Sequence, residues 1–479
     1  MIVRRLVRAL DDRLRFASLA RTALAKVFPD HWSFMLGEIA LYSFTALILT
    51  GIYLSLFFDA SLADTVYRGD YAPLDGATVS AAYASTVQLS WDVRAGLLMR
   101  QAHHWAALIF AAAIVVHMAR VFFTGAFRKP RELNWVVGLT MLIFAFLNGF
   151  AGYSMPDDLL SGVGLQVAYG ITLSVPVAGE WLASWIWGGE FPGEVIARRL
   201  YIAHVFLIPA LLAVLISVHM AILVRQKHSQ FPGPGRTEHN VVGSKLWPGY
   251  AFRSLGLFGA VMAMVFALGG LAQINPVWLY GPFEVGSVTA PAQPDWYVGW
   301  IDGALRLWPA WEVRAFGYTV PNPFFPAVLM PGVVFLILYA WPFLEPLVTG
   351  DRDPHQLLER PRAHPGRVAF GWWAATAALL LLVASASDLI AKETNWPVGG
   401  IIWALRIAVL AVPVLAAAIA FVLARALRDS GADGVLELSA AELTLGWRRR
   451  RPRRPSGRGV PAPVAGGAGT GPPAGKRRR

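Results

Sequence analysis

The chain has 479 residues, of which 56% are hydrophobic and 15% charged, and its formal net charge is +12. It contains no cysteine, which excludes disulfides, thiolate metal sites and cysteine-attached haem, so any redox role must rest on histidine. Positive charge in a soluble protein suggests nucleic acid, but many apolar runs here reach the roughly 20 residues that cross a bilayer. We therefore expect an integral membrane protein that binds no nucleic acid.

The predicted elements begin with a basic amphipathic segment, residues 1–30, which lacks a clear signal-peptide cleavage site. We expect it to lie on the inner membrane surface. Hydrophobic runs then predict an all-α fold with eight transmembrane helices. The expected spans are 32–58, 97–123, 133–153, 200–224, 254–274, 323–348, 366–390 and 399–425. A tail over 431–479, rich in Arg, Pro and Gly, is expected to be disordered.

Loop charge predicts the orientation of these spans. With the N-terminus inside, the inner segments are 127–132, 224–230 and 350–367, which are rich in Lys and Arg. The outer loops include the acidic stretches within 155–160, 189–194 and 283–297. The positive-inside rule agrees with this sorting, so we expect both termini in the cytoplasm.

Four histidines lie within two of the predicted spans. His103 and His117 are 14 residues apart in the second span, and His204 and His219 are 15 apart in the fourth. At about 100° and 1.5 Å per residue, each pair lies near one helix face, about 21–22 Å apart along the axis. Both spans run from outside to inside, so His103 meets the level of His204, and His117 that of His219. Two such imidazole pairs predict two stacked haems, although a single membrane histidine is more often an interhelical hydrogen-bonding residue.

Arginines and glycines support the haem interpretation. Arg100 and Arg120 each lie three residues from a predicted ligand, where a guanidinium can bind a haem propionate or simply reach the interface. Glycines recur 14 residues apart in the first and third spans, which fits two macrocycles inside a four-helix bundle, or ordinary helix packing. These glycines are Gly37, Gly51, Gly138 and Gly152. His104 points about 100° away from His103, and the sequence assigns it no role.

Together with the stretches GYSMPDD (152–158) and PDWY (294–297), these residues resemble cytochrome b of the quinol–cytochrome c reductase (cytochrome bc1) complexes, over roughly residues 30–425. The resemblance implies a di-haem domain over 31–245 and a C-terminal domain of four helices over 246–430. It also implies that His103 and His204 bind a low-potential outer b haem, and His117 and His219 a high-potential inner one.

The PDWY stretch lies in a predicted outer loop and carries the expected quinol chemistry. Asp295 suits a general base, although a solvated loop acid is the plainer interpretation of the local sequence. Tyr297 is expected to hydrogen-bond the quinol or a docked partner, and Pro294 to stiffen the turn. The resemblance implies an outer quinol site that also includes Trp296, Pro156, Asp157 and Asp158. The last two acids extend a proton exit path or cap the following helix.

Departures from the usual family pattern indicate which form of the family this chain resembles. Asp295 replaces the family's usual glutamate, and Arg225 stands where an inner-site histidine is typical, so we assign no inner quinone residues. The segment 231–243, the HHW stretch and the basic C-terminal extension resemble the actinobacterial form. That resemblance implies a bacterial cell membrane and menaquinol as substrate.

The resemblance further implies the catalytic membrane subunit of a quinol–cytochrome c oxidoreductase with proton translocation. One electron is expected to reach a Rieske iron–sulfur subunit, and the other to cross both haems to an inner quinone site. Expected partners are this Rieske subunit, a c-type cytochrome subunit, a second copy in a homodimer, a terminal oxidase in a supercomplex, and membrane lipid. The alternatives are a transporter or channel without cofactor, and the di-haem anchor of a hydrogenase or formate dehydrogenase.

Overall fold

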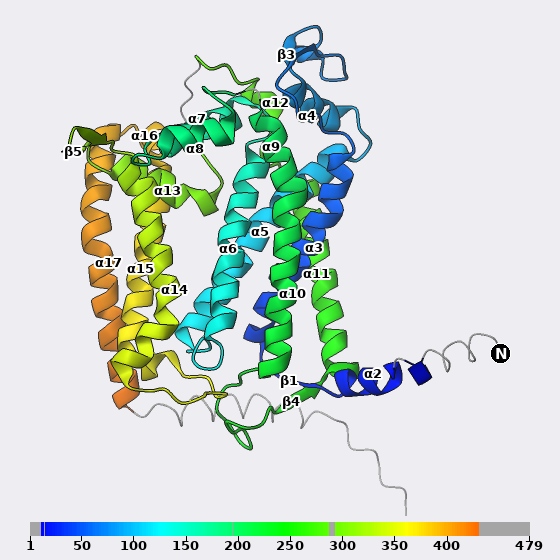
Figure 1. Cartoon of the computed structure of the whole chain (residues 1–479), viewed down its shortest axis with the longest axis vertical. Coiled ribbons are helices and arrows are strands. Elements are labelled where there is room, and N and C mark those ends of the chain that lie inside the picture. The colour runs from blue at the N-terminus through cyan, green and yellow to red at the C-terminus, as the bar shows by residue number, and fades with distance from the viewer. Residues whose placement is uncertain (1–10, 14, 194, 287–292, 431–479) are drawn as a thin grey trace, which may run out of the picture. The chain divides into compact units, whose positions relative to one another are not determined.

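The computed structural model describes residues 11–13, 15–193, 195–286 and 293–430 (Figure 1). Residues 1–426 form one compact unit and residues 427–479 a second. The predicted tail over 431–479 lies outside the described residues, as do the first ten residues of the predicted N-terminal segment. The domain boundary between residues 245 and 246 stays a prediction.

Eight helical segments among the described residues are long and apolar enough to cross a membrane, which confirms the predicted all-α membrane fold. Some begin with a 3-10 or π-helical turn, labelled η. The segments are η1 (Trp32–Met35) with α3 (Leu36–Ser55), α5 (Gly96–Phe123), α6 (Glu132–Tyr153), α9 (Ile196–Ile202) with η3 (Ala203–Leu207) and α10 (Ile208–Gln226), η4 (Leu246–Tyr250) with α11 (Ala251–Leu271), η5 (Phe325–Leu329) with α14 (Met330–Thr349), α15 (Pro365–Ser385) and α17 (Val398–Asp429).

Two ends differ from the predicted spans by five residues or more. The fifth segment extends back to Leu246 rather than starting at 254. Trp247 within it has non-helical angles, φ −109° and ψ 135°, so the continuous helix begins at Pro248, which fits a first turn where no N–H is needed. The seventh stops at Ser385 rather than at 390. There the polar residues that follow start a separate helix, α16 (Ser387–Thr394), whose Asp388 lies 3.0 Å from Arg306.

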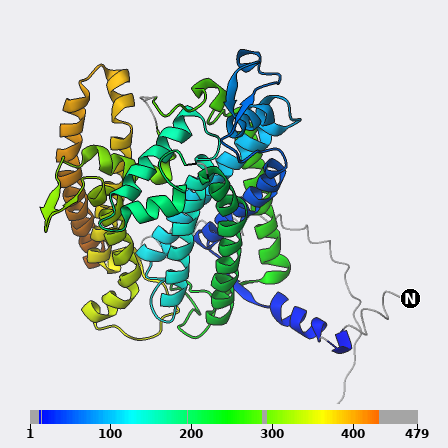
Figure 2. The same cartoon turned by 45° about the horizontal axis from the view of Figure 1, so that its top comes forward.

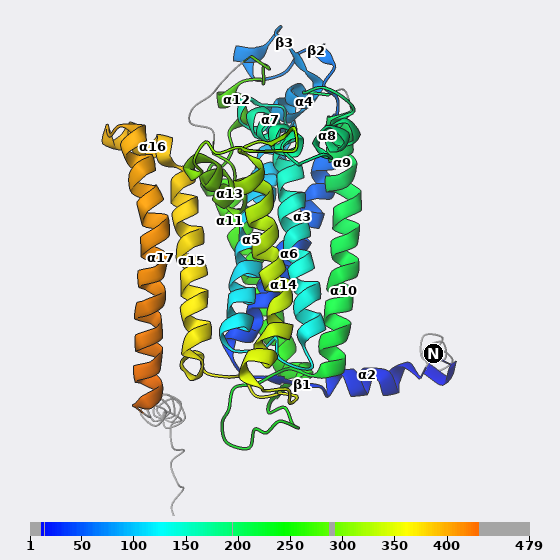
Figure 3. The same ribbon diagram turned by 60° about the vertical axis from the view of Figure 1, so that its left-hand side comes forward.

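Short elements gather at the two ends of the long helices, as Figures 1 and 3 show. At the end predicted to face outward lie α4 (Ala81–Trp91), α7 (Leu159–Leu173), α8 (Gly179–Trp187), α12 (Val277–Tyr280), α13 (Trp296–Leu307), α16, and the antiparallel pairs β2 (Asp64–Val66) with β3 (Thr78–Ser80) and β5 (Val313–Ala315) with β6 (Tyr318–Val320). The remaining turns are η2 (Ala72–Leu74) and η6 (Pro361–Ala363).

At the opposite end, α2 (Phe16–Leu24) runs crosswise to the long helices (Figures 1 and 3). Strand β1 (Val27–Pro29) follows it and pairs antiparallel with β4 (Gly243–Lys245), just before the fifth segment. A helix that crosses the ends of the spans is the geometry expected for the predicted surface segment, within the part of residues 1–30 that the structure describes.

Four of the long helices, α3, α5, α6 and α10, pack around a common core (Figures 1 and 2). Each contributes apolar side chains to it. The buried members are Ala40, Phe44, Phe110, Ala113, Ala145 and Leu212. Along α3 this cluster lies between Gly37 and Gly51, so it separates two levels of the bundle. The fold thus contains the four-helix bundle that the glycine spacing predicts.

Candidate functional site

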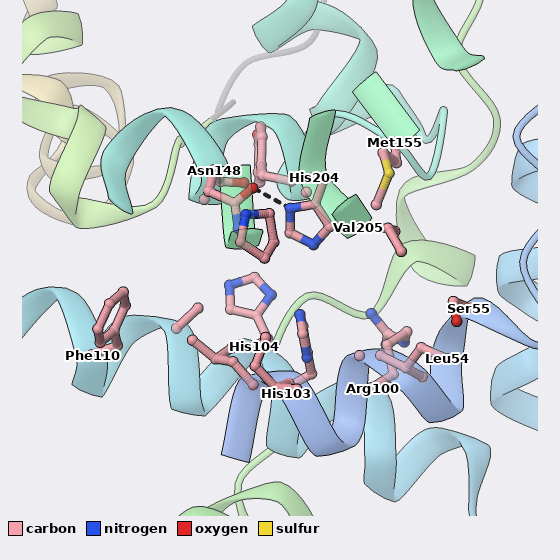
Figure 4. A pocket seen from close by; sticks show the side chains of 18 of the residues that line it. Leu54, Ser55, Arg100, His103, His104, Phe110, Asn148, Met155, His204 and Val205 are labelled. Atoms are coloured by element: carbon pink, nitrogen blue, oxygen red, sulfur yellow. Dashed lines mark hydrogen bonds between the residues drawn. The ribbon is translucent and has the colours of Figure 1, made fainter. Parts of the chain in front are cut away.

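The outer level of the bundle brings together His103 from α5 and His204 from the π-helical turn before α10 (Figure 4). Their ring centroids are 6.0 Å apart and their planes are inclined by 70°. A metal–imidazole bond is about 2 Å long, so this spacing leaves room for one ion between the rings. Pro209, which has no N–H to donate, follows the turn that carries His204. The pairing by depth predicted from the helix repeat is therefore reproduced at this level.

Both outer imidazoles are oriented through their Nδ1 atoms. Nδ1 of His103 lies 2.9 Å from Oγ1 of Thr50 on α3, and that hydroxyl donates to the Ala46 carbonyl at 2.7 Å. Nδ1 of His204 lies 2.8 Å from the carbonyl oxygen of Asn148 on α6 (Figure 4). In each ring Nδ1–H is thus the donor and Nε2 is left to coordinate, which is the usual arrangement of a metal-bound histidine. Sequence reasoning missed Thr50 and Asn148.

The inner level likewise has one histidine from α5 and one from α10. His219 of α10 lies within electrostatic reach of His117 of α5. Nδ1 of His117 is buried and has no hydrogen-bond partner among the described residues. The inner pair therefore also joins α5 to α10, as the sequence predicts.

Each predicted glycine packs against one histidine ring. A Cβ on Gly51 would lie 3.2 Å from Cε1 of His103, and one on Gly37 would lie 3.3 Å from Cε1 of His117. On Gly138 it would meet His219 at 3.7 Å, an ordinary contact, whereas on Gly152 it would overlap the ring of His204. The glycines therefore let α3 and α6 approach the imidazoles closely, and the closest approach is at Gly152.

The two predicted arginines have hydrogen-bond donors left over. Arg100 donates from Nη1 to the Asn275 carbonyl at 2.9 Å and from Nε to Ser90 Oγ at 3.2 Å. Its Nη2 is buried without a partner among the described residues, as are Nε and Nη2 of Arg120. The guanidinium of Arg120 also lies 4.3 Å from the ring centroid of Phe34. Free, buried guanidinium donors beside each histidine pair suit a bound carboxylate.

A cavity of about 380 Å³ opens between the outer histidines and the PDWY stretch. Its walls are mostly apolar, as is usual for cofactor and small-ligand sites. The lining includes His103, His204, Arg100, Pro156, Asp295 and Tyr297. The structure thus gathers predicted haem and quinol residues around one space. Asp157, Asp158, Pro294 and Trp296 do not line it.

Asp295 is held by two side chains at the edge of this cavity. Tyr297 donates from its hydroxyl to Oδ2 at 2.9 Å, and Nε2 of His104 lies 2.8 Å from Oδ1. Tyr297 is only 3% exposed and stacks on Phe146, and its ring fits against α6 because residue 149 is glycine. Burial and the neighbouring Asp295 raise the pKa of Tyr297 well above its usual value, so it stays a donor.

The partner of His104 was missed by the sequence analysis. The only signal available was the doubled histidine of the HHW stretch, because a second imidazole beside a predicted ligand must itself find a polar partner in a membrane helix. That partner, Asp295, is 191 residues further along the chain.

Asp157 and Asp158 take different roles beside the cavity. Asp158 caps α7: its Oδ2 accepts from the Leu160 N–H at 3.1 Å, and Ser161 Oγ accepts from its backbone N–H at 3.0 Å. Asp157 adopts a positive φ of 53°. Burial raises the pKa of Asp157 to about 6, with a hydrogen bond from Ser80 opposing and the charge of Asp158 adding to the shift. Capping is therefore the role that the geometry gives to Asp158.

The basic loops predicted to be cytoplasmic meet at the other end of the bundle. Arg131 donates from Nη1 to the His355 carbonyl at 2.6 Å, and Arg128 lies 2.6 Å from Glu359. Arg367 bonds both Glu345 and Glu359. Burial raises the pKa of Glu359, but His364 and Arg367 outweigh it and lower that pKa to about 2. The segments 127–132 and 350–367 thus form one joined surface.

Known proteins resemble this chain closely. Residues 108–282 match the family described as Cytochrome b(N-terminal)/b6/petB. The chain is 50% identical to the cytochrome bc1 complex cytochrome b subunit of Mycobacterium leprae over 407 residues, which cover 85% of this chain and 74% of that protein. The corresponding Streptomyces coelicolor subunit is 47% identical over 407 residues, with the same coverage of 85% and 74%.

A solved structure shares the fold. It is described as a hyperthermophilic respiratory Complex III, and it aligns with a TM-score of 0.63 over 87% of this chain and 99% of that one. At 21% sequence identity, this likeness speaks to the fold alone.

Proposed function

The chain belongs to the family of cytochrome bc1 complex cytochrome b subunits, and on that premise we propose that it binds two b haems and oxidises menaquinol at the outer cavity. It is the catalytic membrane subunit of a quinol–cytochrome c oxidoreductase, and family membership implies haem and further subunits. The single observation that carries the finer proposal is the pairing of His103 with His204 beside a cavity that also reaches Asp295.

We assign His103 and His204 to the outer haem iron, and His117 and His219 to the inner one. The fit is supported by the 6.0 Å spacing of the outer rings, by their bound Nδ1 atoms, and by the glycines that make room beside all four imidazoles. Arg100 and Arg120 would bind propionates with the donors that are otherwise unpartnered. Bound there, the haems would supply a one-electron path between the two membrane faces.

Quinol oxidation must release two protons and two electrons near the outer face. The quinol would enter the apolar part of the cavity and present one hydroxyl to Asp295, whose carboxylate takes the proton as the O–H bond breaks. The second lone pairs of both carboxylate oxygens remain available, because His104 and Tyr297 each use only one position. Asp157, whose pKa of about 6 suits reversible protonation, would accept protons on the way out. The rest of the outer quinol site, Pro156, Asp158, Pro294 and Trp296, would shape the walls and the loop.

The proposed partner subunits supply the cysteine-bound cofactors that this chain cannot hold. It has no cysteine, so the iron–sulfur centre and any c-type haem must sit on a Rieske subunit and a c-type cytochrome subunit. A homodimer, a supercomplex with a terminal oxidase, and contacts with lipid complete the proposed assembly. The joined basic loops at the end opposite the cavity support a cytoplasmic placement of that end in a bacterial cell membrane.

A haem count tests this function directly. We expect the purified complex to give reduced-minus-oxidised bands of b-type haem, with two b haems for each copy of this chain. His103→Ala should remove the outer haem and leave the inner one, while His117→Ala should do the reverse. A complex without b-type bands would refute the assignment and favour a transporter, and one b haem per chain would refute the second pair.

A further inference from the structure

We infer that His104 is a positioning residue for quinol oxidation: it holds the Asp295 carboxylate at the cavity and away from the helix end that this acid would otherwise cap. The inference rests on the proposed function, in which Asp295 accepts a proton from quinol. It gives a role to the one histidine of the HHW stretch that the haem assignment leaves unused.

The contact itself is short and shielded. Nε2 of His104 lies 2.8 Å from Oδ1 of Asp295, and the two side chains are only 14% and 15% exposed. A carboxylate accepts, so Nε2–H is the donor. Hydrogen bonds to an ionised group are stronger and more directional than neutral ones, especially away from water. With Tyr297 on Oδ2, each oxygen of the acid has one fixed donor.

The uncapped N-terminus of α13 shows that the Asp295 carboxylate prefers His104 and Tyr297 to the backbone of its own helix. Asp295 is the N-cap residue of α13, and aspartate is among the best N-cap residues, yet its side chain makes no cap hydrogen bond. Asp158 occupies the same position on α7 and does cap its helix. The carboxylate of Asp295 therefore bonds side chains at the cavity instead of the N–H groups in the first turn of α13.

The position of His104 links the acid to the outer haem site. It follows His103 directly on α5, and consecutive residues of a helix point about 100° apart. The ring of His103 pairs with that of His204, while His104 reaches Asp295 from the same turn. A single rigid helix thus fixes the distance between the haem ligand and the acid, which the outer loop alone could not do.

The first test measures kinetics in the intact complex. We compare His104→Ala with His104→Gln, whose amide can still donate to Asp295. The matched control is His355→Ala, which removes another imidazole–carboxylate contact, 3.0 Å from Nε2 to Asp351 Oδ1, at the opposite end. We expect His104→Ala to lower kcat about tenfold with KM changed less than about twofold. His104→Gln should recover most of kcat, the control should match the wild type, and all three should retain both b haems.

The second test measures coupling and structure. Asp295→Asn alone tests the proposed function, because normal turnover in that variant would show that Asp295 is not the proton acceptor. If that variant is slow, adding His104→Ala should reduce kcat little further, because both changes act on one group. A cryo-EM structure of His104→Ala should show the Asp295 carboxylate turned toward the first N–H groups of α13. Wild-type kcat in His104→Ala, fully multiplicative losses in the double variant, or an unmoved carboxylate would each overturn the inference while leaving the proposed function intact.

Discussion

Oγ1 of Thr50 lies 2.9 Å from Nδ1 of His103, so a hydroxyl on α3 orients an imidazole on α5. A hydrogen bond from the non-ligating nitrogen of a metal-bound imidazole makes that ring a better electron donor and fixes its orientation. We expect Thr50→Val, which keeps the shape of the side chain, to retain the outer haem and raise its midpoint potential. A bond worth about 1 kcal/mol sets an upper bound of about 40 mV. Redox titration checks this, with the inner haem as internal control; an unchanged outer potential would remove Thr50 from the site.

The four glycines should not respond alike to alanine. The Cβ of Gly152→Ala would overlap the ring of His204, whereas that of Gly138→Ala would lie 3.7 Å from His219. We expect Gly152→Ala to lose or weaken the outer haem, at a cost of about 1–3 kcal/mol for overpacking. Gly138→Ala should keep the inner haem. Haem content measured by spectroscopy checks the contrast, and equal losses in both variants would contradict it.

Asp295→Asn keeps the size of the side chain and removes its basicity. We expect both b haems to remain and quinol oxidation to fall by about 100-fold, the low end of what a general base contributes. The measurement is steady-state turnover of the complex with a soluble quinol. Tyr297→Phe is the informative companion, because it removes one donor but leaves the base, and it should slow turnover less.

Asp157 gives a pH dependence of stability. Its pKa is raised from 3.8 to about 6 in the fold, so its contribution is fully present below the unfolded pKa and is lost as pH rises through about 6. Asp157→Asn should therefore leave the thermal unfolding temperature nearly unchanged near pH 3 and raise it by a few degrees near pH 7.5. Asparagine also tolerates the positive φ of 53° at this position. A variant that is less stable than the wild type near pH 7.5 would show that burial of this charge is not the dominant cost.

The sequence predicted the eight spans because bilayer thickness imposes a long apolar run on each of them. It also predicted which histidines share a level, because the helix repeat fixes angles and rises within one helix. It did not predict where His104 finds its partner, since Asp295 lies in an outer loop 191 residues away and loops carry no repeat. For Asp158 it left a helix cap and a proton path as alternatives, and it did not show that Asp295 leaves its own helix uncapped, because both acids have the same local signature of a helix start.

Each outer imidazole is hydrogen-bonded to a different neighbouring helix. His103 on α5 bonds Thr50 on α3, and His204, just before α10, bonds the Asn148 carbonyl on α6. On the proposed ligation, a nascent chain that has inserted only three of these helices lacks either a ligand or the group that orients one. Haem capture at this level therefore reports completed insertion of the fourth helix. Cofactor loading at this level would then depend on the insertion of all four helices.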